Sequence, residues 1–231
     1  MYTRYVSRSF LSILIFSFMV ISLVAAAGVS AQTLFDAALG NDIMGATKLI
    51  AEGADVNASN DDGNNPLIAA AYKGNLEITE LLIKNKAKIN TANNGGFTPL
   101  FFAVQEGHKD VAELLLKNKA KSIKTKTGAL AFPMHIAVEN GHLEIVKLLV
   151  EYKAKVNVGD DNGYTPLYYT ALGGQKDIAA FLLENKAKAN INSKTKFTPL
   201  HMAANNGFFE IAELLVKHKA KVNVGDDNGY T

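Results

Sequence analysis

The sequence predicts an all-α solenoid of about six helix-turn-helix units with projecting β-hairpin-like loops. The first observation is the spacing of the five prolines in this 231-residue chain, which lie 33, 34, 33 and 33 residues apart: Pro66, Pro99, Pro133, Pro166 and Pro199. The second is that each proline is followed by Leu or Met, an alanine-rich stretch and a glycine. The third is a second apolar run after each glycine. A self-similar period of this length is typical of repeat architectures.

The N-terminal segment, residues 1–31, has the pattern of a secretory signal peptide. Arg4 and Arg8 precede an apolar stretch from Phe10 to Ala27, and small residues follow at Val29-Ser30-Ala31. We predict cleavage after Ala31, a repeat domain over 32–231 and an exported protein, periplasmic or secreted if the source is bacterial. An uncleaved membrane anchor is the alternative, because the apolar run has about the minimum length for a membrane span. After cleavage we expect no membrane span.

Each unit has readable starts and ends. Thr98, Thr165 and Thr198 precede proline and are predicted helix N-caps, with proline at the first helical position where no amide partner is lost. The first helix is short and ends at glycine. The second is amphipathic, with Leu143 and Val146 at helical spacing in one copy. A unit of this size cannot bury its own apolar face, but stacked neighbours can.

Two strings carry a family resemblance: Phe197-Thr198-Pro199-Leu200-His201-Met202-Ala203-Ala204 and Gly141-His142-Leu143-Glu144-Ile145-Val146-Lys147-Leu148-Leu149. At a period of 33 they closely resemble the ankyrin repeat. The resemblance implies paired antiparallel helices and a concave binding face of hairpin tips and first helices. It also implies that the chain binds another protein. The units begin near residues 33, 66, 99, 133, 166 and 199, and the first lacks the Thr-Pro start.

The third loop, Lys121 to Phe132, departs from the repeat. It has one extra residue, and Phe132 replaces the capping threonine. We expect an irregular hairpin and a helix start weakened by about 1 kcal/mol.

The ends of the second helices also depart from the family. Gly53-Ala54-Asp55 appears once, and later copies read Lys-Ala-Lys, beginning at Lys86, Lys119, Lys153, Lys186 and Lys219. We expect a non-glycine residue in or beside a left-handed C-cap five times, at a cost of about 1 kcal/mol each. The cost is expected to be smaller where a neighbouring asparagine takes the strained angle. Lys219 to Thr231 repeats Lys153 to Thr165 residue for residue, so we expect either a longer array or an exposed apolar end face.

No catalytic set emerges, so we predict that the chain is not an enzyme and needs no cofactor or metal. Cysteine is absent, which excludes disulfides and thiolate sites. His135 and His201 occupy the family's Thr-Pro-Leu-His position, and His108 and His142 its Gly-His turn, where the resemblance implies structural roles. His218 lies off the pattern at an expected exposed helix end. Three acidic pairs fall at expected hairpin tips, where solvation leaves no reason for a raised pKa: Asp61-Asp62, Asp160-Asp161 and Asp226-Asp227.

Candidate protein-binding residues are of two kinds. Aromatic residues precede Thr-Pro at Phe97, Tyr164 and Phe197, where they either pack between hairpins or take part in recognition. The others lie on first helices or loop tips and differ between copies: Tyr72, Asn94, Gln105, Glu106, Glu139, Asn140, Asp161, Leu172, Lys194 and Asn205.

A basic edge is the other candidate surface, with one lysine per unit: Lys88, Lys121, Lys155, Lys188 and Lys221. It is either a solubilising face or a surface for an anionic partner such as lipid headgroups. Apart from Arg4 and Arg8 the chain has as many lysines as acidic residues, which argues against a nucleic-acid partner. Three functions therefore stay open: an exported protein-binding scaffold, an electrostatic binder of the cell envelope, and a non-catalytic arm of a longer protein. The partner and the oligomeric state are left open.

Overall fold

The computed structural model describes residues 33–122 and 132–225. The predicted signal peptide and the pair Asp226-Asp227 lie outside these ranges. The described residues from Leu34 onward form one compact unit.

The described residues form twelve helices in six consecutive pairs, and none of these residues is assigned to a strand. The prediction of an all-α repeat solenoid is confirmed. The pairs are α2 (Leu34–Leu39) with α3 (Ile43–Ala51), α4 (Pro66–Lys73) with α5 (Leu76–Lys84), α6 (Pro99–Gln105) with α7 (Lys109–Lys117), α8 (Pro133–Glu139) with α9 (Leu143–Glu151), α10 (Pro166–Gly173) with α11 (Lys176–Glu184), and α12 (Pro199–Asn205) with α13 (Phe209–Lys217). Over the described ranges no helix is long and apolar enough to cross a membrane.

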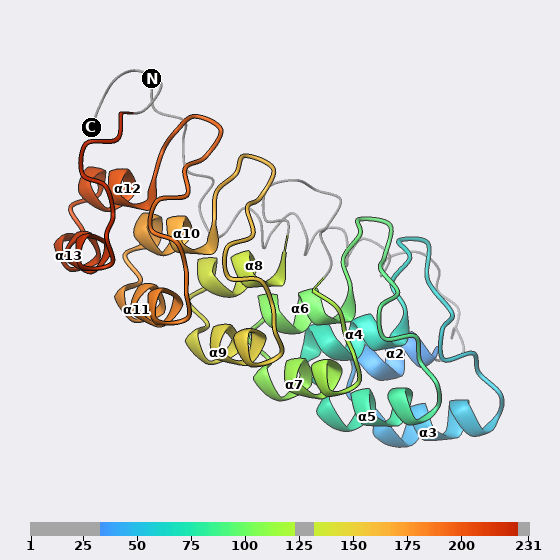
Figure 1. Cartoon of the computed structure of the whole chain (residues 1–231). Coiled ribbons are helices and arrows are strands. Elements are labelled where there is room, and N and C mark those ends of the chain that lie inside the picture. The colour runs from blue at the N-terminus through green and yellow to red at the C-terminus, as the bar shows by residue number, and fades with distance from the viewer. Residues whose placement is uncertain (1–32, 123–131, 226–231) are drawn as a thin grey trace. The chain divides into compact units, whose positions relative to one another are not determined.

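The helices stack in two layers (Figure 1). First helices α2, α4, α6, α8, α10 and α12 contact one another in that order, and second helices α3 to α13 do the same. Every first helix has at least one fully buried alanine, which allows neighbouring helices to pack closely: Ala37, Ala70, Ala103, Ala137, Ala171 and Ala203. One leucine of each second helix from α5 onward is also fully buried: Leu82, Leu115, Leu149, Leu182 and Leu215. The core is therefore continuous along the stack, as the solenoid argument requires.

The starts of the first helices follow the capping rule. Thr98, Thr165 and Thr198 each accept a hydrogen bond from the backbone N–H three residues on, as predicted. Asn65 caps α4 in the same way, which the sequence argument did not anticipate. Helix α8 has no side-chain cap, because Phe132 stands at its N-cap position.

The second helices end in a left-handed residue, as expected. The five residues are lysines with φ between 65° and 70°: Lys86, Lys119, Lys153, Lys186 and Lys219. The expectation that a neighbouring asparagine takes this angle is wrong, since Asn85 has φ −91°. The bond from Ala87 N–H to Leu82 O, 3.0 Å, closes a Schellman motif that requires the left-handed angle at Lys86.

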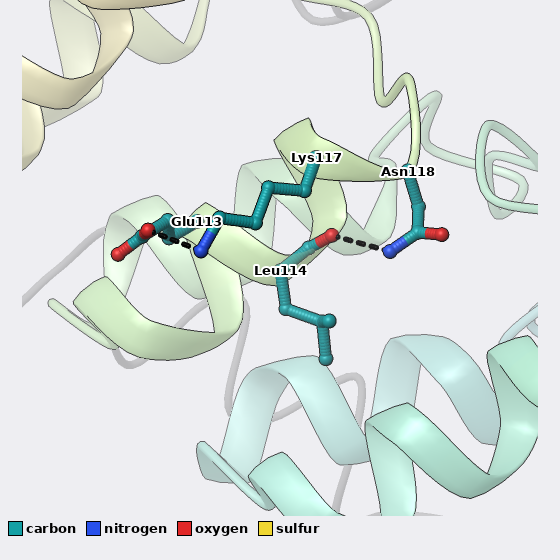
Figure 2. A network of polar contacts seen from close by, with 4 residues as sticks. All are labelled: Glu113, Leu114, Lys117 and Asn118. Carbon is teal, nitrogen blue, oxygen red and sulfur yellow. Dashed lines mark hydrogen bonds and ion pairs between the residues drawn. The ribbon is translucent and has the colours of Figure 1, made fainter.

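The asparagines have a different role at this end. Figure 2 shows Asn118 donating from Nδ2 to Leu114 O over 2.9 Å. Asn85 and Asn185 bond to their own helices in the same way. Glu113 and Lys117 form an ion pair of 2.6 Å on the same helix, and the pairing holds the pKa of Glu113 below its ordinary value. The Asn118 side chain therefore gives a main-chain carbonyl in the last turn of α7 a hydrogen-bond donor.

The four fully described loops between helix pairs are tight hairpin-like turns, which extend beyond the layer of first helices in Figure 1. In one, Asn93 N–H donates to Phe97 O (3.0 Å) and Gly96 N–H donates to Asn93 O (2.9 Å). The loops at 60–64, 160–164 and 193–197 repeat this pattern. The loop tips therefore have defined geometry.

Candidate protein-binding surface

Adjacent repeats are joined at the turn between first and second helices. In the second to fifth repeats the residue after the turn glycine donates to a carbonyl of the preceding repeat. His108 Nε2 lies 3.0 Å from Tyr72 O, and His142 Nε2 lies 3.3 Å from Gln105 O. Gln175 donates similarly to Glu139 O over 3.4 Å. The structural role that the resemblance implied for the Gly-His histidines matches these contacts.

The same histidine rings explain the turn glycine of the preceding repeat. A Cβ atom on Gly74 would lie 2.5 Å from the His108 ring, and a Cβ on Gly107 would lie 2.9 Å from the His142 ring. Gly74 also has φ +73°, which side chains rarely adopt.

These junctions use the main chain of the residues that end the first helices. Tyr72, Gln105, Glu139 and Leu172 all accept through their backbone carbonyls. Any side chain at these positions would leave the bond intact. Their side chains are half-buried, and that of Asn205, the equivalent in the last pair, is exposed.

Two neighbouring candidates behave differently. Asn140 donates to Gln105 O over 3.3 Å and so belongs to the junction. Glu106 is exposed and accepts from Gln105 Nε2 over 2.8 Å. Burial, and secondarily the Glu106 charge, raises the pKa of Tyr72.

The aromatic candidates pack onto the first helix of their own repeat. Phe97 lies 4.5 Å from Phe101 between ring centroids, and Tyr164 stacks on Tyr168 at 4.1 Å. Phe197 meets the His201 ring edge-on at 5.6 Å. All three candidates are half-buried, so they stiffen the hairpin base and leave only part of each ring accessible.

The hairpin tips are linked to one another, which sequence reasoning missed. Asn94 donates through Nδ2 to Asp61 O (2.9 Å) and through its amide to Asp62 O (3.0 Å). Lys194 N–H donates to Asn162 O over 2.8 Å. Asp161 and the Lys194 side chain are exposed. The first two tips are therefore bonded to each other, and so are the last two.

The expectation that the acidic pairs are solvated is wrong for Asp160, which is 8% exposed. Its Oδ1 accepts from Asn162 N–H (2.9 Å) and Tyr164 N–H (2.8 Å), and its Oδ2 accepts from the Tyr169 hydroxyl (2.8 Å). Burial, and next the bond to Asp160, raises the pKa of Tyr169 above its ordinary value. Asp160 is buried because an aspartate inside this turn caps the turn's own amides.

His135 and His201 occupy equivalent positions but make different contacts. His201 Nδ1 accepts from Thr198 N–H (3.1 Å) and lies 2.8 Å from the Thr198 hydroxyl. His135 donates from Nε2 to Tyr164 O (3.1 Å), while its buried Nδ1 has no hydrogen-bond partner. Phe132, which stands in the place of Thr198, has no hydroxyl that could bond to this nitrogen. Burial lowers the pKa of His135 and favours the neutral ring.

The five lysines of the basic edge are all exposed. Their backbone amides are held by a row of asparagines that sequence reasoning missed. Asn57, Asn90, Asn157 and Asn190 each accept, over 2.8 Å, from the amide of Lys88, Lys121, Lys188 and Lys221 respectively. The recurrence of Asn two residues after Lys-Ala-Lys was the signal that could have revealed the row. At the same position the third loop has Ile123, which lies outside the described residues.

Family models of ankyrin repeats match most of the chain. A model of three repeat copies matches residues 34–127 and 122–195, and a model of many copies matches 182–231. The chain belongs to the ankyrin repeat family. Among solved structures it is similar to the human ASB11 ankyrin repeat domain, with 28% identity and a TM-score of 0.78 over 87% of this chain and 90% of that one. No curated protein matches.

Ankyrin repeats generally mediate protein–protein interaction, and ankyrin repeat proteins are typically non-catalytic scaffolds. None of the matched families is an enzyme family. In the described ranges no three His, Cys, Asp or Glu side chains lie close enough together to hold a metal ion.

Proposed function

We propose that this ankyrin repeat protein is an exported scaffold that binds a protein partner through its first-helix ends and hairpin tips. The observation that carries the proposal is the use of backbone carbonyls at the repeat junctions. Tyr72, Gln105, Glu139 and Leu172 each satisfy the next repeat with the main chain. These junction bonds therefore do not require the particular side chains that the four positions carry.

The side chains at this position differ in chemistry: tyrosine, glutamine, glutamate, leucine and, in the last pair, asparagine. They lie one repeat apart in a stack whose helices follow one another in order. A row of unlike side chains on a rigid stack can present a pattern that one partner fits and another does not. Exposed Glu106 and Lys194 add charges of opposite sign near the row.

Capture from an extract tests the surface. The variant Glu139→Lys/Leu172→Asp/Asn205→Lys should lose the captured protein and keep the melting temperature, because the carbonyl bonds remain. A control with the same net charge change, Glu80→Lys/Glu184→Gln/Lys217→Gln, alters exposed residues of the second helices. Equal loss in both variants, or retention in the first, would contradict this assignment.

Export is supported by the sequence of residues 1–31, with Arg4 and Arg8 before the apolar stretch. The test is to express the full chain in a bacterium and sequence the N-terminus of the protein in the periplasm and medium. We expect Gln32 as the first residue. An intact Met1 in the membrane fraction would support the anchor instead.

The basic edge supports a second candidate, binding to an anionic surface. The asparagine bridges fix the backbone at four of its five lysines. Co-sedimentation with vesicles containing an anionic lipid should then fall steeply as salt rises. Sedimentation that is insensitive to salt, or equal with neutral vesicles, would remove this candidate.

A further inference from the structure

A hollow of about 420 Å³ lies at the junction between the third and fourth repeats. Its floor is apolar: Ala154 and Val158 are half-buried there, and Leu116 of α7, Met134 of α8 and Leu149 of α9 are buried behind the surface. Phe132 and Tyr152 also line it. The volume falls within the range of small-molecule sites in proteins.

The two aromatic residues are departures from the repeat. Phe132 stands where Thr98, Thr165 and Thr198 cap their helices. Tyr152 stands where the second, third and fifth repeats have asparagine. Each departure loses a hydrogen bond that the other repeats make: the side-chain cap of α8 and the bond that Asn118 makes to its own helix.

His135 Nδ1 is left without a partner beside the same position. The other repeats act as an internal reference for what the fold needs. Residues that break the local rules at one place, and converge on one hollow there, indicate a functional role.

Three lysines give the hollow its charge: Lys121, Lys153 and Lys155. None of the described residues that line it carries a carboxylate. Within the described ranges none of the three lysines forms an ion pair with another side chain. The hollow therefore combines an apolar floor with a cationic rim, which suits an apolar body with an anionic head.

We propose that this hollow binds a single-chain amphipathic carboxylate, a medium-chain fatty acid. The acyl chain lies against the half-buried side chains of Phe132, Tyr152 and Val158, and the carboxylate lies among the three lysines. The proposal goes beyond the scaffold function and does not depend on it, because the hollow is lined by other residues than the first-helix ends.

Calorimetric titration of the chain with dodecanoate below its micelle concentration tests the proposal. Dodecyltrimethylammonium and dodecyl maltoside carry the same tail with a cationic and a neutral head. We expect one dodecanoate per chain, bound at least tenfold more tightly than either. Three exposed rim charges are each worth up to about 1 kcal/mol, so Lys121→Gln/Lys153→Gln/Lys155→Gln should weaken dodecanoate binding about tenfold to a hundredfold.

The matched control is Lys188→Gln/Lys219→Gln/Lys221→Gln, which removes the equivalent charges at the junction between the fifth and sixth repeats. It should change the affinity less than twofold. Tyr152→Asn introduces the residue that the second, third and fifth repeats have at this position and should weaken binding without lowering the melting temperature.

A second readout locates the ligand. With carbon-13 labelled methionine methyl groups, dodecanoate should shift the Met134 signal and leave Met202 of α12 unchanged. Another hollow, of about 590 Å³, is lined by Leu200, Val216 and Val222 at the last repeat. A shift at Met202 together with weaker binding in the control variant would place the ligand there and overturn the proposal. Equal affinity for all three head groups would overturn it as well.

Discussion

Replacing Lys186 by glycine should stabilise the array. Lys186 has φ 69° at the end of α11. A left-handed conformation costs a residue with a side chain about 1–2 kcal/mol. The backbone contacts survive the change, since Lys186 N–H bonds to Leu183 O and Asn157 Nδ2 bonds to Lys186 O. The greater freedom of glycine in the unfolded chain returns about 0.4–1 kcal/mol. The net gain is therefore about 0.5–1 kcal/mol.

Lys188→Gly is the matched control two residues later. Lys188 has no positive φ, and its amide keeps the bond to Asn157 Oδ1. Glycine there relieves no strain and should destabilise by about 0.5–1 kcal/mol. The two lysine-to-glycine changes should thus shift stability in opposite directions.

Thermal unfolding followed by circular dichroism, with urea titration as a second method, measures the difference. The five left-handed lysines share this geometry. A variant with glycine at all five should gain about 2–5 kcal/mol, which raises the melting temperature by about 10 °C in a chain of this size. If Lys186→Gly and Lys188→Gly shift the melting temperature in the same direction, backbone strain at the helix ends is not the controlling term.

Three further predictions concern the junctions. Asn157→Ala removes two hydrogen bonds to the next repeat and should destabilise the protein by about 1–2 kcal/mol. A loss of less than about 0.3 kcal/mol in a urea titration would mean that the asparagine row does not contribute to stability. Gly74→Ala should destabilise far more than Gly207→Ala. Both glycines have φ near 70°, but only at Gly74 does the His108 ring occupy the place of the new Cβ. Calorimetric melting compares the two variants, and equal losses of stability would show that φ alone matters. Burial holds the pKa of His135 below its ordinary value of 6.5, so below that pH the unfolded chain binds a proton that the folded chain does not. The stability that the neutral His135 ring contributes is therefore complete above about pH 6.5. It declines as pH falls below that value, by at most about 1.4 kcal/mol per pH unit. His135→Gln should remove that part of the pH dependence, and an unchanged profile in urea titrations from pH 8 to 5 would contradict it.

Local sequence signals predicted the elements well because their causes are local. A threonine before proline can cap a helix with its own side chain, so Thr98, Thr165 and Thr198 were identified without a tertiary structure. The left-handed lysines were predicted for the same reason. The prediction failed on which residue of the pair takes the angle, because that depends on the bond from Ala87 N–H to Leu82 O.

The candidate surface was only partly readable. The sequence marks positions whose side chains vary, such as Tyr72 and Leu172, but not that their carbonyls hold the next repeat. The sequence predicted a solvated Asp160, and this was wrong. Its burial against Tyr169 arises only when the hairpin is folded, so no local sequence signal indicates it.

The sequence by itself determined the period, the helix pairs, their caps and the chain's lack of cysteine chemistry. These features follow from interactions within about four residues or from composition. The helix pair is also repeated six times, which strengthens the signal. Only the tertiary structure decided which repeat positions meet: the asparagine row beneath the lysines, the ring of one repeat on the glycine of another, and the hollow where Phe132, Tyr152 and the three rim lysines converge. Those contacts join residues about thirty positions apart, and stacking of neighbouring repeats brings them together.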